Sequence, residues 1–393
     1  MKSLLADDHR LPERVLMGPG PSQIHPRVLQ ALSLPTIGHL DPAFVRLMDD
    51  IKQALRSVMQ TENTFTLPVS GPGSLAQEAC IINLLEPGDK CVICINGVFG
   101  GRMKAMAERC GAQVIAVEQA WGRAVDPQAL RDTLQAHPDA VLVGFVHAET
   151  STGALSDAET LAAVAREFDC LILADTVTSL AGVPVRIDEW GLDAVYSGTQ
   201  KCLSCPPGLG PVSLNERALE RVRSRRTPVQ SWFMDFAPLI DYWQGEKRVY
   251  HHTAPVNALY GLAESLAIVL EESMPATWQR HRQAHEALAA GLQAMGLKMA
   301  VPVAERAPQL NAVEIPDGVD DASIRSSLLD QFGLEVGAGL GPLAGRIWRI
   351  GLMGQSATLE NVQFCLSSLS SALEAQGHAV DASGAQRAAA AVG

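Results

Sequence analysis

Residues 141–175 read VLVGFVHAETSTGALSDAETLAAVAREFDCLILAD and contain two apolar runs separated by a helical pattern. The runs 141–146 and 171–174 are continuously apolar, as expected of strands that are buried on both faces of a sheet. Between them, residues 157–168 have apolar side chains at helical spacing. Because a strand, a covering helix and a second strand form a parallel unit, this stretch predicts a mainly parallel sheet.

The same alternation continues on both sides of this unit. Further short strands are predicted at residues 65–70, 91–95, 114–117, 194–196 and 211–214. Residues 296–375 instead mix short strands with helices. We therefore predict an α/β fold with a large domain, whose mainly parallel sheet is covered by helices, and a smaller C-terminal α+β domain.

The predicted division of the chain has four parts. Residues 1–16 form an N-terminal arm, 17–274 the large domain, 275–378 the small domain, and 379–393 a tail that is disordered or loosely helical. Pro275 should interrupt the helical stretch that joins the two domains, which places the boundary there. The tail is assigned on its Ala-rich composition and its terminal position.

The bulk composition is that of a globular protein and excludes several classes of partner. Apolar residues make up 47% of the 393 positions, so a packed core is expected. The formal net charge of −12 argues against binding to nucleic acid, because such a surface must neutralise phosphates. The sequence has no apolar run of about 18 residues, so we expect no membrane span. A start without an apolar leader predicts a cytoplasmic protein.

Eight cysteines raise the question of a metal site. The pairs Cys91/Cys94 and Cys202/Cys205 have the spacing of zinc-ligand pairs. Cys91 and Cys94, however, lie on a predicted strand, where residues three apart face opposite sides. We therefore expect buried cysteines of the core and no metal.

Residues 196–202 read YSGTQKC and place Lys201 in a tight turn after a short strand. In open α/β sheets the carboxyl ends of the strands form the ligand-binding edge. A lysine that is desolvated there has a lowered pKa and can form a Schiff base. A lone lysine in such a turn would more often be an ordinary exposed residue, so the interpretation depends on its neighbours.

Two further segments end at the same edge. Asp175 closes the apolar strand 171–174, where it could cap the next turn or keep the ring nitrogen of pyridoxal 5′-phosphate protonated. Ser70-Gly-Pro-Gly-Ser74 precedes a helix, so its backbone N–H groups can approach a phosphate. The loop also fits the dinucleotide pattern G-x-G-x-x-A, which leaves a nicotinamide-dependent dehydrogenase as an alternative. Asp89 lies in a turn before a strand instead of ending the second strand, which disfavours that alternative.

On these residues the chain resembles the fold-type I, class V aminotransferases, which depend on pyridoxal 5′-phosphate. The first matching segments are Asp175-Thr-Val177 and Ser197-Gly-Thr-Gln-Lys201. Four others narrow the resemblance to the alanine–glyoxylate and serine–glyoxylate (serine–pyruvate) group: Gly18-Pro-Gly-Pro21, Glu149-Thr-Ser-Thr-Gly153, Tyr250-His-His-Thr253 and Trp348-Arg-Ile-Gly-Leu-Met-Gly354. The resemblance covers about residues 15–375.

The resemblance implies which residues hold the cofactor ring. Lys201 would bind the cofactor and then act as the general base. Asp175 would pair with the ring nitrogen. Val177 and Phe99 would pack on the two faces of the ring, with Phe99 in place of a tryptophan that many relatives have. Thr150 would bring a hydroxyl close to the cofactor.

It also implies how the phosphate and the substrate are bound. Gly73, Ser74 and Gln200 would contact the phosphate from one subunit. Tyr250 and Thr253 would reach it from the neighbouring subunit of a homodimer with shared active sites. The substrates would be a small amino acid and a keto acid, bound through Arg349, which would hold the carboxylate, and at Gly20.

The implied reaction is ping-pong transfer of the amino group of alanine or serine to glyoxylate or pyruvate. Ureidoglycine–glyoxylate aminotransferases resemble this chain at Gly341-Pro-Leu-Ala-Gly345, but they typically carry Gln and Asn at the positions of His39 and Tyr250. Pyridoxamine–pyruvate aminotransferase is similar at Asp41-Pro-Ala-Phe44. A cysteine desulfurase would need a mobile cysteine near the site, and Cys202 and Cys205 look structural. A cofactor-bound regulator is also an alternative, although no DNA-binding module is attached.

Overall fold

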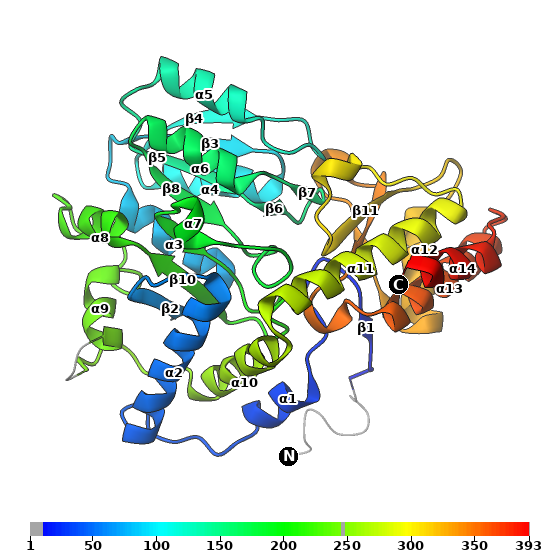
Figure 1. Cartoon of the computed structure of the whole chain (residues 1–393), viewed down its shortest axis with the longest axis horizontal. Coiled ribbons are helices and arrows are strands. Elements are labelled where there is room, and N and C mark those ends of the chain that lie inside the picture. The colour runs from blue at the N-terminus through cyan, green and yellow to red at the C-terminus, as the bar shows by residue number, and fades with distance from the viewer. Residues whose placement is uncertain (1–10, 245–247, 393) are drawn as a thin grey trace, which may run out of the picture.

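The computed structural model describes residues 11–244 and 248–392, in which a large α/β unit lies next to a smaller α+β unit (Figure 1). A seven-stranded sheet with the order β2-β10-β9-β8-β5-β3-β4 forms the centre of the large unit. Its strands are β2 (Phe65–Ser70), β3 (Lys90–Ile95), β4 (Gln113–Glu118), β5 (Leu142–Val146), β8 (Leu171–Asp175), β9 (Ala194–Tyr196) and β10 (Leu209–Leu214). Neighbouring strands are parallel except that β10 is antiparallel to β2 and β9. The predicted α/β fold with a mainly parallel sheet is confirmed.

Helices cover the sheet and connect its strands. They are α1 (Pro26–Leu32), α2 (Pro42–Met59), α3 (Gly73–Leu84), α4 (Val98–Arg109), α5 (Pro127–Ala136), α6 (Ala158–Glu167), α7 (Ile187–Trp190), α8 (Glu216–Arg223), α9 (Phe236–Gln244) and α10 (Val256–Glu272). Several begin where the sequence supplies a cap: Asp41, Asp126 and Asp157 each accept a hydrogen bond from a backbone N–H of the first turn. A short hairpin of β6 (Ala148–Glu149) and β7 (Ala154–Leu155) follows β5.

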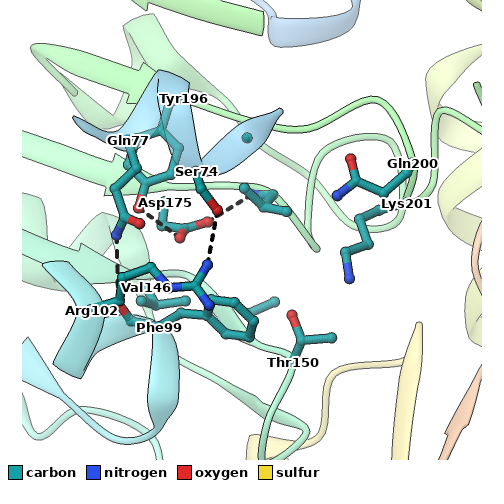
Figure 2. Close-up of a pocket in the computed structure, with 13 residues that line it drawn as sticks. Ser74, Gln77, Phe99, Arg102, Val146, Thr150, Asp175, Tyr196, Gln200 and Lys201 are labelled. Carbon is teal, nitrogen blue, oxygen red and sulfur yellow. Dashed lines mark hydrogen bonds between the residues drawn. The ribbon is translucent and has the colours of Figure 1, made fainter. Parts of the chain in front are cut away.

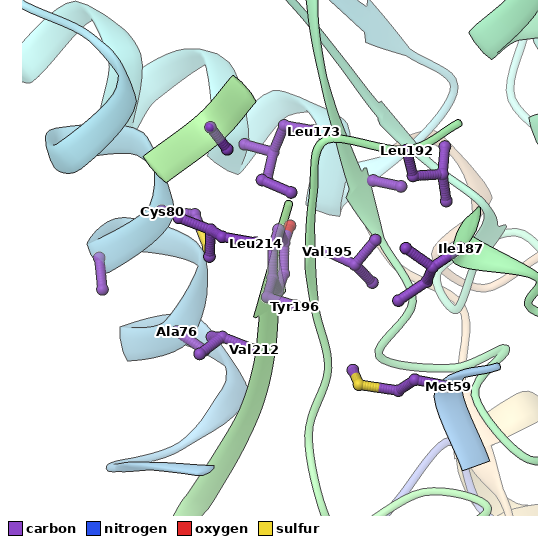
Figure 3. Close-up of a cluster of buried hydrophobic side chains, with 14 of the residues drawn as sticks. Met59, Ala76, Cys80, Leu173, Ile187, Leu192, Val195, Tyr196, Val212 and Leu214 are labelled. Carbon is purple, nitrogen blue, oxygen red and sulfur yellow. The ribbon is translucent and has the colours of Figure 1, made fainter. Parts of the chain in front are cut away.

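Apolar side chains fill the space on both faces of β9 and β10. Figure 3 shows Ala76 and Cys80 of α3 on one side of these strands, with Met59 and Ile187 on the other. All four side chains are buried in one continuous core. The small residues of α3 let the helix lie close to the sheet, and this fixes its N-terminus at the carboxyl edge of the strands.

The smaller unit has its own hydrophobic cluster around an antiparallel sheet of β11 (Leu310–Glu314), β14 (Ile347–Gly351) and β13 (Gly337–Ala338). Its helices are α11 (Met274–Ala294), α12 (Asp321–Phe332) and α13 (Leu359–Ala375). The chain enters it at Ser273, whose positive φ of 75° separates α10 from α11. The domain boundary at residues 274/275 remains our proposal.

The N-terminal arm also contacts this smaller unit. β1 (Val15–Leu16) pairs in parallel with β12 (Leu334–Glu335), and Met17 is buried in the second cluster. The first ten residues of the predicted arm lie outside the described residues.

Of the two states predicted for the tail 379–393, disorder was wrong for residues 382–392, which are helical as the alternative expected. These residues form α14 (Ala382–Val392), which packs on α11 and α13 (Figure 1). Ala385 and Ala389, four residues apart, face the core and are buried. Gly384 N donates to Asp381 Oδ1 at 2.8 Å, which caps the helix. The helical alternative is favoured because alanine has the highest helix propensity and needs only a small apolar face to dock.

The cysteines are all buried and free. Within the described ranges, no group of three or more Cys, His, Asp or Glu side chains is placed to hold a metal ion. No helix in the same ranges has the length and hydropathy that crossing a bilayer requires.

Candidate active site

A pocket opens where the carboxyl ends of β5, β8 and β9 meet the N-termini of α3 and α4 (Figure 2). This is the edge at which open α/β sheets bind ligands. The pocket brings together most of the residues that the sequence predicted for the cofactor and substrate site. It is lined by Gly73, Ser74, Gln77, Phe99, Arg102, Val146, Ala148, Thr150, Asp175, Val177, Tyr196, Gln200 and Lys201.

Asp175 is a buried carboxylate at the end of β8. Tyr196 lies opposite it in the register of β8 and β9 and donates from Oη to Oδ2 at 2.6 Å. Val177 N donates to Oδ1 at 2.8 Å. Burial raises the pKa of Asp175 to about 6, although both hydrogen bonds oppose the rise. Asp175 forms no ion pair with any of the described residues. A protonated ring nitrogen would be a cationic partner for it, so the site fits the cofactor ring.

Lys201 follows β9 in a tight turn, and only 7% of its surface is exposed. Its Nζ donates to Pro19 O. Burial, and then the positive charge of Arg349, lower the pKa of Lys201 to about 8. The neutral, nucleophilic form of this amine is therefore a minority near physiological pH, but a far larger one than for an ordinary exposed lysine.

Gly20, predicted at the substrate site, lies directly against Lys201. Its φ is +103°, and a Cβ there would lie 2.7 Å from Lys201 Nζ. The loop that contains Gly20 therefore closes tightly over the lysine, and any side chain at this position would displace it.

Phe99, Val177 and Thr150 all line the pocket, as predicted for residues near the cofactor ring. The position of Phe99 is set by Glu149, whose Oε2 accepts from Phe99 N at 3.1 Å at the start of α4. Thr150 shares a hydrogen bond with the Thr178 hydroxyl. Sequence analysis did not reveal the supporting role of Glu149, which is buried beneath the helix.

The N-terminus of α3 forms a cradle for an anion. Its N-cap is Pro72, so no side chain caps the first backbone N–H groups. A Cβ on Gly73 would lie 3.2 Å from Ser197 O and 3.3 Å from Val177 Cγ2, so a side chain here would have to push its neighbours apart. Gln200 lines the same pocket, and its side-chain amide can donate an N–H group to an anion. These features fit a phosphate group.

Arg349 lies on β14 of the smaller unit, beside Lys201, and is 7% exposed. Its Nε donates to Ala338 O at 2.7 Å and Nη1 donates to Thr150 O at 3.1 Å. Burial lowers the pKa of Arg349 to about 10. The sequence predicted a carboxylate partner but gave no sign of the two carbonyls that hold the guanidinium in place.

Tyr250 and Thr253 are not brought to the pocket within one chain. Tyr250 is 59% exposed and Thr253 is exposed as well. Their hydroxyl oxygens lie 3.5 Å apart on the surface. Their predicted contact with a phosphate therefore requires a second subunit.

Sequence reasoning missed Gln77, Arg102, Val146, Ala148 and Tyr196 as pocket residues. Tyr196 could have been found, because two adjacent parallel strands end together. Arg102 follows Phe99 by one helical turn, which also places it on the same face.

Comparisons with known proteins agree with this geometry. Residues 15–350 match the family model "Aminotransferase class-V". The alanine–glyoxylate aminotransferase of Mus musculus is 42% identical over 93% of this chain and 88% of its own. The (S)-ureidoglycine–glyoxylate transaminase of Bacillus subtilis is 38% identical over 96% of this chain and 95% of its own.

Solved structures give the same result. The ureidoglycine–glyoxylate aminotransferase of Bacillus subtilis has a TM-score of 0.95 and 40% identity, over 97% of this chain and 98% of that chain. The alanine–glyoxylate aminotransferase of Nostoc sp. has a TM-score of 0.91 and 46% identity, over 93% and 96%. Together with the pocket, these likenesses show that the chain is a pyridoxal-phosphate-dependent enzyme of the class-V aminotransferase family.

Proposed function

We propose that this enzyme transfers the amino group of alanine or serine to glyoxylate or pyruvate by a ping-pong mechanism. The observation that supports it is the crowding at Lys201, because Gly20 packs directly against the lysine side chain, which a Cβ at this position would displace. Arg349 lies beside the same lysine and can hold a carboxylate. The site thus suits small amino and keto acids, and similarity to alanine–glyoxylate aminotransferases points to the same substrates.

Each residue of the site has a definite task in this reaction. Pyridoxal 5′-phosphate, when bound, withdraws electrons and stabilises negative charge at the substrate Cα. Lys201 Nζ removes the Cα proton and later returns a proton, since its lowered pKa lets it act in both directions. Asp175 keeps a proton on the ring nitrogen through its negative charge. Arg349 fixes the substrate carboxylate so that the Cα–H bond faces Lys201.

Arg349→Ala should lower kcat/KM for alanine and glyoxylate alike by roughly 30- to 1000-fold, since a lost charge-assisted bidentate contact costs about 2–4 kcal/mol. Cofactor affinity should be unchanged, because the guanidinium contacts only Ala338 O and Thr150 O in the described structure. Arg349→Lys is the matched control, because it keeps the positive charge but loses the planar guanidinium. Its kcat/KM should lie between those of the wild type and Arg349→Ala. Steady-state kinetics with both substrates would contradict this role if one substrate alone were affected.

Transfer from ureidoglycine is the second candidate, because the Bacillus subtilis enzyme of that name superposes with a TM-score of 0.95. His39 and Tyr250 stand at two positions where enzymes of that group typically carry Gln and Asn. Their rings lie together, with centroids 5.5 Å apart. Both departures thus fall at one place on the surface, which favours a different amino donor.

A donor-by-acceptor screen tests the substrate proposal. Alanine, serine, glycine and ureidoglycine are each offered with glyoxylate and with pyruvate, and keto-acid formation is measured. We expect the highest kcat/KM with alanine or serine. A preference for ureidoglycine by more than about tenfold, equivalent to 1.4 kcal/mol, would overturn the proposal in favour of the second candidate.

We further propose that the enzyme is a cytoplasmic homodimer in which each active site uses residues of both subunits. Apolar side chains are exposed on two neighbouring segments: Leu29, Leu34, Ile37, Leu40, Trp232, Val249 and Tyr250. His39 contacts Tyr250, so the two segments meet. Apolar exposure of this kind is typical of a subunit interface. It adjoins Tyr250 and Thr253, the residues predicted to reach the partner's phosphate.

A mixed dimer tests this sharing. Tyr250→Phe homodimers should bind cofactor about tenfold more weakly, because a hydrogen bond to a charged phosphate is lost. In a dimer of one Lys201→Ala subunit and one Tyr250→Phe subunit, the intact lysine receives the wild-type tyrosine of its partner. Differently tagged subunits allow the mixed dimer to be purified, and its intact site should regain wild-type affinity. An affinity that stays at the Tyr250→Phe level would show that Tyr250 serves its own subunit.

A further inference from the structure

We propose that Arg102 binds the cofactor phosphate from within the same subunit, as its cationic partner. This inference rests on the cofactor that the family uses and is independent of the amino donor and acceptor proposed above.

The position of Arg102 places its guanidinium between two parts of the cofactor site. Its Nη1 donates to Ser74 Oγ at 2.9 Å, and its Cζ lies 4.8 Å from the centroid of the Phe99 ring. Figure 2 shows Arg102 extending across Phe99 towards Ser74. The first turn of α4 is held in place, because Glu149 Oε2 accepts hydrogen bonds from the backbone N–H groups of Phe99 and Gly100.

The charges around Arg102 call for an anion. Ser74 is the second residue of α3, whose N-terminus carries the positive end of the helix dipole and has no side-chain cap. Among the described residues, 11–244 together with 248–392, Arg102 forms no ion pair. A cation beside a positive helix end is unfavourable by itself. A phosphate between them would satisfy both groups.

The hydrogen-bonding capacity of Arg102 leads to the same conclusion. A guanidinium has five N–H donors, and the described structure uses one of them, towards Ser74. The remaining donors can form a bidentate contact with phosphate oxygens, which a lysine cannot reproduce. Ser74 and Arg102 would then bind the phosphate together, with Gly73 N and Gln200 beside them.

Arg102 could instead serve only to hold Phe99 in place through its contact with the ring. The two roles differ in their dependence on the phosphate group. A phosphate contact affects pyridoxal 5′-phosphate but leaves pyridoxal, which has the ring without the phosphate, unaffected. Support of Phe99 affects both ligands equally.

The experiment measures the dissociation constants of pyridoxal 5′-phosphate and pyridoxal for the full-length, cofactor-free protein. Arg102→Gln should weaken binding of pyridoxal 5′-phosphate by roughly 10- to 100-fold and change pyridoxal binding by less than about threefold. Arg102→Lys should reduce the preference for the phosphorylated ligand by a smaller factor. Arg109→Gln, an exposed arginine on the same helix, is the matched control and should change neither constant.

Equal weakening of both ligands would overturn the proposal and assign Arg102 to the support of Phe99. Unchanged binding of both ligands would overturn it as well. If Arg102→Gln fails to fold, as judged by circular dichroism, Arg102→Lys decides the question. An unchanged ratio of the dissociation constants of pyridoxal 5′-phosphate and pyridoxal in that variant would refute a bidentate phosphate contact. None of these outcomes depends on which amino donor the enzyme prefers.

Discussion

Lys201→Ala should lower the rate of transamination by at least about 10⁴-fold while leaving the protein folded, because the change removes both the covalent anchor of the cofactor and the base. The fold should tolerate the change. Lys201 Nζ has one hydrogen-bond partner in the described structure, Pro19 O, and Gly20 lies against its side chain. Single-turnover kinetics with alanine at saturating cofactor measure the loss.

Added small amines provide a control for this variant. If Lys201 acts mainly by moving the Cα proton, a free amine such as methylamine should restore part of the rate in Lys201→Ala. Lys201→Arg should not recover activity, because a guanidinium stays protonated and cannot serve as the base. A Lys201→Ala rate within tenfold of the wild type would contradict the assigned role.

Asp175→Asn should slow removal of the Cα proton by about 10³- to 10⁴-fold while cofactor binding persists, since electrostatic stabilisation and control of the ring proton are both lost. The amide has the same shape and can still accept from Val177 N, so the local turn should survive. What it lacks is the negative charge that holds a proton on the ring nitrogen. The change in cofactor absorbance after rapid mixing with alanine reports the rate.

Two further variants separate the charge of Asp175 from its position. Tyr196→Phe removes the 2.6 Å hydrogen bond to Asp175 Oδ2 but leaves the carboxylate, and should cost about tenfold. Asp175→Glu keeps the charge and should retain more activity than Asp175→Asn. If Asp175→Asn reacts within a few-fold of wild type, Asp175 only caps the turn.

The sequence predicted the sheet and the central residues of the site for a physical reason. Strands buried on both faces are continuously apolar, so their ends are visible as the points where polar residues begin. Asp175 and Lys201 both lie at such ends, and parallel strands bring their carboxyl ends to one edge. The glycine-rich turn before α3 is equally visible, because close approach of backbone to an anion requires glycine.

The residues that the sequence did not reveal depend on packing between distant segments. Arg102 and Gln77 are polar residues on helices, where most such residues face solvent. The contact of α3 with α4 brings the faces that carry them together at the pocket. The same holds for α14, whose alanines form a helix because α11 and α13 offer a surface on which to dock.

The position of the covalent link to the cofactor tests the central claim most directly. The wild-type enzyme is loaded with pyridoxal 5′-phosphate, reduced with borohydride and digested, and the modified peptide is identified by mass spectrometry. The structure predicts one modified residue, Lys201. This amine lies in the pocket with Asp175, and its burial and the charge of Arg349 lower its pKa. A stable adduct on any other lysine, with Lys201 unmodified, would contradict the account.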